Sequence, residues 1–310
     1  MRSIAITGGS GFIGGAIRRR ALVDRRAVRL LGRSRPSGGF LEKWERVDLT
    51  EEAALSHAVE GAAALIHAAP YIGSDLQRSL ATNVEGTRRL VAGCREAGLT
   101  TIVYVSTTGV YGLGPHRGTS EDAHPKPASA LSQARLEAEQ IVLAAGGVVI
   151  RPHLVYGPGD RRVLPSIWRA TEIAGGLIEE GNALISILST DALAVQVWHV
   201  VDSLLSGRVV SPLILNAASG SPSSVRVVVD ALVRATGSKR RLPSVSLAKA
   251  RPLLLNSGFS IHQIEMIAHD NWFKSALPTI AGKTWLDAPG FGLTIEDEAW
   301  YRETLAPFRR

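Results

Sequence analysis

Near its start the chain carries three glycines spaced three residues apart, directly behind a short apolar run. Residues 4–6 read Ile-Ala-Ile, and residues 7–14 read Thr-Gly-Gly-Ser-Gly-Phe-Ile-Gly, with the spaced glycines at Gly8, Gly11 and Gly14. The apolar run predicts a buried strand, and the residues after the glycines predict a helix. Glycines at this spacing permit a tight turn and close packing of the helix on the strand. The pattern therefore predicts one strand–turn–helix unit of a parallel α/β sheet.

Strand-like and helical segments alternate through the first half of the 310-residue chain. Such alternation is typical of a doubly wound parallel sheet with helices on both faces. We expect this α/β sheet over residues 1–157 and a smaller C-terminal lobe over 158–310, with later strands free to return to the sheet. The expected strands are residues 4–6, 28–31, 64–67, 102–105, 148–150 and 213–216; the expected helices are 14–23, 51–59, 83–97, 164–174 and 224–236, with another opening at a Thr294–Asp297 capping box.

Composition excludes several other classes of protein. No apolar run approaches the ~18 residues that a membrane-spanning helix needs. Cys94 is the only cysteine, so thiolates cannot build a metal cluster, and we expect no metal. The net charge of +7 comes from scattered arginines without a long basic stripe interleaved with aromatics, so we expect no nucleic-acid partner. A cytoplasmic protein with no membrane contact is the expectation.

The glycine turn is also a candidate phosphate site. The free N–H groups and the dipole at the start of the next helix attract a diphosphate, which indicates a dinucleotide cofactor. After the second expected strand come Gly32, Arg33 and Ser34, where an NAD site normally has an acid for the ribose 2′-hydroxyl. Arg33 instead offers a forked donor to a 2′-phosphate. We therefore expect NADP(H) in preference to NAD(H); the alternative is that Arg33 is ordinary surface charge.

Further motifs follow the glycine turn in a fixed order. They are Asp48-Leu49, His67-Ala68-Ala69, and the segments 83–87, 105–112 and 151–159. Together they resemble the extended short-chain dehydrogenase/reductases, the NAD-dependent epimerase/dehydratase family. The resemblance implies a Rossmann-type NAD(P)-binding domain over 1–157 and a substrate-binding lobe over 158–310. It also implies the following cofactor contacts: Gly8, Ser10, Gly11, Phe12, Ile13, Gly14, Arg33, Ser34, Asp48, Leu49, Ala68, Ala69, Ser106, Arg135 and Pro152.

The acid–base couple of that family, Tyr-x-x-x-Lys, is not retained. Leu131 stands in the tyrosine position and Arg135 in the lysine position. Leucine cannot move a proton, and arginine stays protonated at any working pH. The resemblance implies that Thr107 keeps the catalytic hydroxyl and that Arg135 holds the ribose or stabilises developing negative charge. The proton would come from a substrate group, from water or from Tyr71, which lies in a loop that faces substrate in relatives, whereas His153 is expected to pack on a loop.

Two apolar residues in the second half bear on the substrate. Relatives that act on nucleotide-linked sugars carry Asn and Arg at the positions matched here by Leu154 and Leu184. A less charged ketone is therefore favoured over a diphosphate sugar, unless Arg161, Arg162 and Arg226 compensate.

The leading hypothesis is an NADP(H)-dependent oxidoreductase that acts on a carbonyl of a small biosynthetic metabolite with a non-standard proton donor. Three alternatives stay open: an NADP-binding sensor or assembly partner without redox activity, a nucleotide-sugar epimerase or ketoreductase, and a non-redox isomerase or cyclase on the same scaffold. The resemblance further implies a homodimer formed through helices near residues 83–97 and 129–145.

Overall fold

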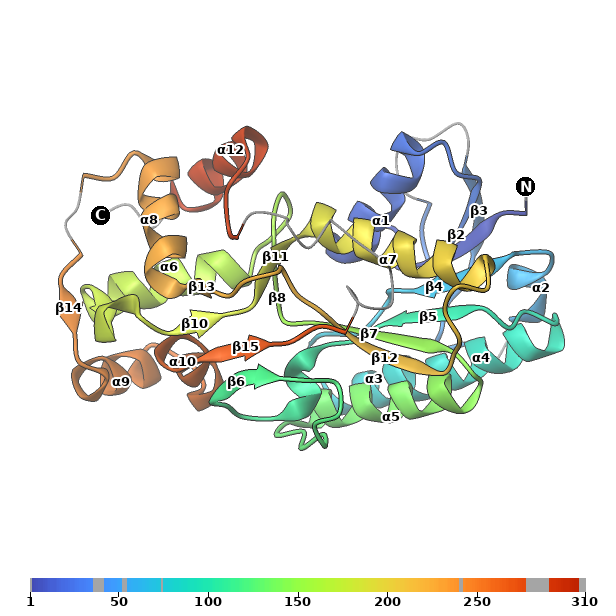
Figure 1. Cartoon of the computed structure of the whole chain (residues 1–310), viewed down its shortest axis with the longest axis horizontal. Helices are drawn as coiled ribbons and strands as arrows, with labels where there is room; N and C mark the ends of the chain where they lie inside the picture. The colour runs from blue at the N-terminus through green and yellow to red at the C-terminus, as the bar shows by residue number, and fades with distance from the viewer. Residues whose placement is uncertain are drawn as a thin grey trace.

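The main body of the molecule is a seven-stranded sheet in the order β12-β7-β5-β4-β1-β2-β3, with each neighbouring pair parallel (Figure 1). It is seen in a computed structural model, which describes residues 2–35, 42–51, 55–73, 75–239, 242–276 and 290–306. The predicted doubly wound α/β sheet is confirmed. Its strands are β1 (Ile4–Thr7), β2 (Val28–Gly32), β3 (Glu42–Arg46), β4 (Ala64–His67), β5 (Ile102–Val105), β7 (Val148–Pro152) and β12 (Leu213–Ala217).

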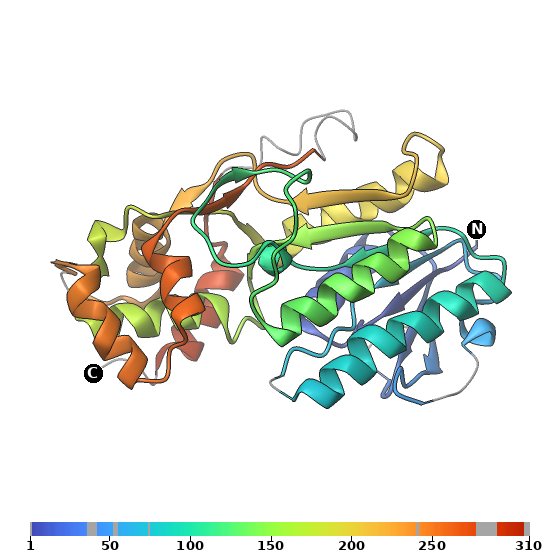
Figure 2. The same ribbon diagram turned by 90° about the horizontal axis from the view of Figure 1, so that it is seen from below.

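Helices cover both faces of this sheet. On one face α1 (Phe12–Val23) packs against α7 (Thr190–Leu205), and the Trp198 indole N–H donates to the Ile17 carbonyl at 2.9 Å. On the other face α4 (Gly86–Glu96) and α5 (Ala130–Ala144) lie side by side (Figure 2). Because successive strand side chains alternate between faces, the strands other than β3 contribute to two apolar cores, one beneath each helical layer.

A second, smaller body has its own apolar core and a four-stranded sheet in the order β13-β10-β15-β6. Two further pairs of short strands, β11-β8 and β14-β9, complete its strand pairing among the described residues. Its strands are β6 (His116–Thr119), β8 (Leu154–Tyr156), β9 (Leu177–Ile178), β10 (Leu184–Ile185), β11 (Ile187–Ser189), β13 (Ser223–Ser224), β14 (Ser244–Val245) and β15 (Asn271–Phe273). Its helices are α6 (Val163–Ala174), α8 (Val225–Thr236), α9 (Leu247–Asn256), α10 (Ile261–Ala268) and α12 (Ile295–Thr304).

The two bodies exchange strands across residue 157. β12 comes from beyond that point and pairs along β7 in the large sheet, while β6 comes from before it and pairs with β15 in the small one. The chain therefore crosses between the bodies more than once. Neither body is therefore built from one continuous segment of the chain. The assignment of cofactor binding to residues 1–157 and of substrate binding to residues 158–310 stays a prediction.

Most expected elements are found within a few residues of their predicted bounds, but α7, α9, α10 and the short strands of the smaller body were not expected, and three further differences follow. β3 was not expected, because Glu42–Arg46 is largely polar. Expected helix 51–59 is seen only as α2 (Ser56–Val59), and residues 52–54 lie outside the described part. Expected helix 83–97 is preceded by α3 (Leu76–Ser79) and starts within a π-helical turn (Leu80–Glu85) before α4 begins.

Three of the described helices, α5, α10 and α12, begin at a reciprocal side-chain cap that fixes where the helix starts. Thr294 accepts from the backbone N–H of Asp297, whose carboxylate accepts from the Thr294 backbone N–H, as predicted. Ser129 and Ser132 form the same reciprocal cap at the start of α5.

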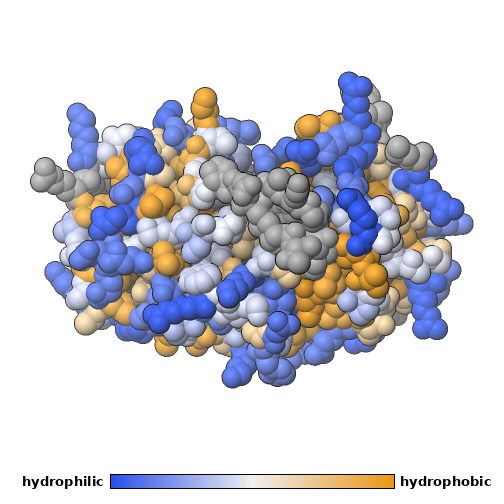
Figure 3. Space-filling view, in the orientation of Figure 1, coloured by the Kyte–Doolittle hydropathy of each residue, from blue (hydrophilic) through white to orange (hydrophobic). Residues whose placement is uncertain are grey.

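On the face shown in Figure 3 the largest apolar area lies over the region of β12, the edge strand of the large sheet. No helix within the described ranges combines the length and apolarity needed to cross a bilayer.

Candidate active site

The glycine turn fits only residues without a side chain at two of its positions. Gly8 has φ of +74°, and a Cβ there would lie 2.2 Å from the Ala68 carbonyl oxygen. A Cβ on Gly14 would lie 2.1 Å from the Gly8 carbonyl oxygen. The turn is closed by a hydrogen bond from the Gly11 N–H to the same Gly8 oxygen at 2.8 Å. The backbone after β1, the end of β4 and the start of α1 are therefore in direct contact.

A buried histidine holds these elements in register beneath the turn. Thr87 donates its hydroxyl to the Asn83 carbonyl at 2.6 Å, so it accepts the Nε2 hydrogen of His67 at 3.1 Å. The Nδ1 atom of His67 then accepts from the Thr7 hydroxyl at 2.7 Å. Burial, together with the positive charge of Arg135, lowers the pKa of His67 to about 3. His67 is therefore a neutral structural link between β1, β4 and the helix layer.

A smaller hollow of about 330 Å³ opens beside the turn and runs along the ends of β1 and β2. The hydroxyl and N–H of Thr50 donate to Asp48, and with the nearby charge of Arg33 they lower the pKa of this carboxyl. Trp44 and Arg78 also line the hollow, and the sequence did not predict either. The predicted cofactor contacts found here are Gly8, Ser10, Gly11, Arg33, Ser34, Asp48, Leu49, Ala68 and Ala69.

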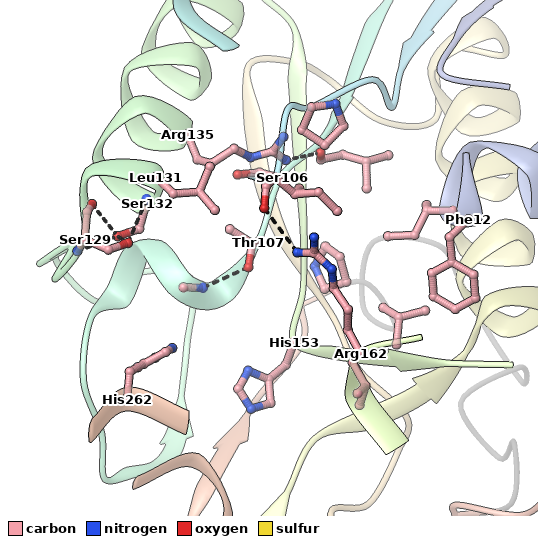
Figure 4. A pocket seen from close by; sticks show the side chains of 18 of the residues that line it. Phe12, Ser106, Thr107, Ser129, Leu131, Ser132, Arg135, His153, Arg162 and His262 are labelled. Carbon is pink, nitrogen blue, oxygen red and sulfur yellow. Dashed lines mark hydrogen bonds between the residues drawn. The ribbon is translucent and has the colours of Figure 1, made fainter. Parts of the chain in front are cut away.

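A larger cavity of about 930 Å³ lies beside this hollow, between the two bodies (Figure 4). Gly11, Ala68 and Pro70 line both spaces, so the two lie side by side. Gly14 lines neither, which leaves it the packing role described above. The predicted contacts in the larger cavity are Gly11, Phe12, Ile13, Ala68, Ser106, Arg135 and Pro152, and Thr107 and Leu131 lie there with them.

Three polar side chains meet in the wall behind Leu131. Thr107 caps a 3-10 turn (Thr108–Tyr111), with its Oγ1 accepting from the Gly109 N–H at 3.1 Å. Arg135 is buried, donates from Nη2 to the Val105 carbonyl, and lies with its guanidinium 4.8 Å from the ring centre of Tyr104. The Nη1 atom of Arg135 and the Oγ atom of Ser106 are buried without a partner among the described residues.

No tyrosine is found among the described residues that line the larger cavity, so none stands in for the one that the family uses at position 131. Tyr111 donates to Asn216 at 3.0 Å and Tyr156 donates to the Gly292 carbonyl at 2.6 Å, and neither lines the larger cavity. Tyr71 lines the smaller hollow, with the Arg78 guanidinium 5.1 Å from its ring centre. It is therefore not brought together with Thr107 and Arg135, and its role as proton donor stays a prediction without geometric support.

The larger cavity is also lined by His262, which the sequence did not assign to the site, by His153, and by Arg162, which the sequence offered only as a possible partner of a substrate diphosphate. His153, expected only to pack, lines the larger cavity; its Nδ1 atom lies 2.7 Å from the Thr108 hydroxyl, and its ring packs 4.9 Å from Phe273. Burial lowers the pKa of His153 to about 3, so the ring is neutral. His262, near the start of α10, and Arg162, at the start of α6, line the same cavity.

These observations fit a bound nicotinamide dinucleotide. Glycine lets the turn pack directly on the end of β4 and the start of α1, and Gly8, Ser10 and Gly11 of the turn line the smaller hollow beside the α1 N-terminus, whose free N–H groups attract a phosphate. Ser106 and Arg135 present unpartnered donors in the wall of the larger cavity. Fold and site together define a dinucleotide-dependent enzyme of the Rossmann class.

Comparison with known proteins gives the family. The family model described as "NAD dependent epimerase/dehydratase family" matches residues 4–209. The chain belongs to this family, which confirms the resemblance inferred from its motifs, and it is an NAD(P)-dependent oxidoreductase.

Individual relatives include reductases of oxo compounds. The chain is 30% identical to a 2-alkyl-3-oxoalkanoate reductase of Stenotrophomonas maltophilia, over 80% of this chain and 79% of the relative. It is 29% identical to a 4-hydroxy-2-methyl-3-oxo-4-farnesyl-3,4-dihydroquinoline-1-oxide ketoreductase of Stigmatella aurantiaca, over 52% of this chain and 53% of that one. The solved structure of MoeE5 with UDP-glucose and NAD is similar in fold, with a TM-score of 0.72, 22% identity, and coverage of 98% of this chain and 100% of MoeE5.

Proposed function

We propose that the protein uses NADPH to reduce a carbonyl group of a small, largely apolar metabolite. One observation carries the proposal: the larger cavity brings Thr107 and Arg135 together with the predicted nicotinamide contacts, between walls that include Ile13, Val105 and Leu131. The names of two relatives, a 3-oxoalkanoate reductase and a ketoreductase, support the same reaction type.

The residues of the cavity divide the chemistry between them. NADPH, when bound, would supply the hydride that forms the new C–H bond. Thr107 accepts a hydrogen bond from Gly109, which leaves its hydroxyl hydrogen for the carbonyl oxygen of the substrate. Arg135 is a buried cation that forms no ion pair among the described residues, so it stabilises negative charge that develops on this oxygen. Water supplies the proton that completes the alcohol.

The preference for NADPH over NADH rests on the end of β2. Arg33 is exposed and lines the smaller hollow beside Gly32, where an acid would otherwise repel a 2′-phosphate. A guanidinium in this place can pair with the phosphate through two parallel hydrogen bonds.

Isotope transfer tests the reaction type directly. The protein is incubated with NADPH deuterated at C4 and a panel of 3-oxo acids, ketones and keto sugars, and products are examined by mass spectrometry. We expect deuterium on the carbinol carbon of at least one alcohol product. Tight NADPH binding without deuterium transfer to any product of this panel would contradict the proposal.

We also propose that two copies associate through α4 and α5, the helices that lie side by side in Figure 2. Light scattering coupled to size-exclusion chromatography tests this, and a monomer mass at micromolar concentration would contradict it.

A further inference from the structure

The larger cavity contains positive charge that no acidic side chain of its described lining neutralises. Arg135, Arg161 and Arg162 line it, and Asp160 is the one acidic residue among the described lining residues. Both oxygens of Asp160 are occupied. They accept from the backbone N–H groups of Arg162 and Val163 at 2.8 Å each, from the N–H of Leu164 at 2.9 Å, and from the hydroxyl of Tyr301 at 2.9 Å.

Arg162 is the cation best placed to meet a ligand. Figure 4 shows its side chain reaching from the start of α6 into the cavity, toward the segment that carries Ser106 and Thr107. Its Nη1 atom donates to the Ile72 carbonyl at 3.1 Å, which links the lobe to the loop after β4. This is its one side-chain hydrogen bond within the described part of the chain, so the rest of the guanidinium fork is available.

We propose that Arg162 binds a carboxylate carried by the substrate, so that the substrate is an oxo acid with an apolar body. This inference rests on the proposed carbonyl reduction. A planar guanidinium matches a carboxylate through two parallel hydrogen bonds between opposite charges, and this pairing is stronger than the single bond that Arg162 donates to the neutral carbonyl of Ile72. A carboxylate therefore displaces the Ile72 contact.

The surroundings of Arg162 favour a substrate anion over a cofactor phosphate. Arg162 lines the larger cavity but not the smaller hollow, and the diphosphate already has the glycine turn and the α1 N-terminus. Ile72, Leu113 and Ile261 line the same cavity and are 50%, 47% and 56% exposed, so they offer an open apolar contact. An apolar chain attached to the oxo acid covers these side chains.

Binding of redox-inert probes tests the inference without turnover. Decanoate and methyl decanoate are titrated by calorimetry into the full-length protein saturated with NADP⁺. We expect Arg162→Gln to weaken decanoate binding about 10- to 100-fold and Arg162→Lys to weaken it less, since lysine keeps the charge but not the fork. Methyl decanoate should bind within about threefold of wild type in every variant, because it offers no charged partner.

Arg169 supplies the matched control. It lies on the same helix, is also exposed, and also donates one guanidinium hydrogen bond to a main-chain carbonyl, that of Ser257 at 2.8 Å, but it does not line the cavity. Arg169→Gln should leave the affinity for decanoate unchanged. Equal weakening of decanoate and its ester by Arg162→Gln, or equal effects of the two arginine variants, would overturn the inference.

Two further measurements separate the possible failures. If Arg162→Gln weakens NADPH itself by the same factor as decanoate, the arginine serves the cofactor diphosphate and the inference fails. In turnover, Arg162→Gln should raise KM for 3-oxodecanoate and leave KM for its methyl ester unchanged. If Arg162→Gln selectively weakens decanoate binding but the protein reduces no ketone, the proposed function is refuted and the carboxylate site is supported. If the protein reduces both the acid and the ester, and Arg162→Gln changes both reactions equally, the proposed function is supported and the carboxylate site is refuted.

Discussion

Adjacent glycines on α1 allow a test of why the turn requires glycine. Gly14 and Gly15 share a helix turn, but a Cβ on Gly14 would lie 2.1 Å from the Gly8 carbonyl oxygen, whereas a Cβ on Gly15 meets nothing closer than 3.7 Å. Since backbone atoms flank Gly14, replacing it with alanine forces α1 and the turn apart by roughly 1 Å.

Two opposing free energies decide whether each substitution stabilises or destabilises the protein. Alanine in a helix is favoured over glycine by about 0.5–1 kcal/mol, and this gain applies to both positions. Overpacking against backbone costs about 1–3 kcal/mol, and this cost applies only to Gly14. We therefore expect Gly15→Ala to raise the melting temperature by about 1–3 °C and Gly14→Ala to lower it by several degrees. Because the Gly8 carbonyl shifts with the turn, Gly14→Ala should also weaken NADPH binding about tenfold or more.

Calorimetric melting with and without NADPH, and fluorescence titration of NADPH, measure both effects in the same three proteins. Gly15→Ala should bind NADPH like wild type. If Gly14→Ala were as stable as Gly15→Ala and bound NADPH as tightly, close contact at the turn would not be the reason for glycine there.

Three further predictions concern the site and its supports. Leu131→Tyr combined with Arg135→Lys should raise kcat/KM for carbonyl reduction about 10- to 100-fold, because a positioned acid–base group supplies about 10²–10⁴-fold. An unchanged or lower rate of NADPH consumption would show that another group already donates the proton. Arg33→Gln should weaken NADPH about 10- to 100-fold and leave NADH within about twofold, measured by nicotinamide fluorescence, because only NADPH carries the 2′-phosphate. His67 and His153 have a folded-state pKa of about 3 against an ordinary 6.5, so the unfolded chain binds more protons between these values. The free energy of unfolding should therefore be greatest above about pH 6.5 and should fall below it by up to about 1.4 kcal/mol per pH unit for each histidine. Urea titrations at a series of pH values measure this, and a His67→Gln variant should show a shallower dependence on pH.

Local chemistry explains why much of the fold could be read from the sequence. The first strand, the glycine turn and the Thr294 cap each depend on residues within a few positions of one another. β3 escaped prediction because its residues, Glu42–Arg46, are mostly polar, and only parallel pairing with β2 makes them a strand. With β3, the sequence also missed Trp44 in the wall of the smaller hollow.

The site residues, too, could be predicted where they depend on local motifs and could not where they depend on the tertiary fold. Predicted cofactor contacts surround the two hollows because motif spacing fixes where each loop leaves the sheet. His262 reaches the cavity only because the lobe folds back over the sheet, which no local pattern encodes. His153 lies next to the predicted contact Pro152, but the sequence did not show that its ring would line the cavity. Tyr71 shows the converse: it follows Ala69 by two residues, yet its ring lines the smaller hollow with Arg78 and not the larger cavity.

The strand order has a consequence for how the protein is made. β7 pairs with β5 on one side, but its other edge is covered by β12, which ends at residue 217. A ribosome must therefore synthesise some sixty residues beyond β7 before that edge is paired. During this interval the nascent chain exposes an unpaired strand whose five residues are all buried in the finished protein. A chain truncated at residue 157 should consequently aggregate, whereas one extended through β12 should have a complete sheet.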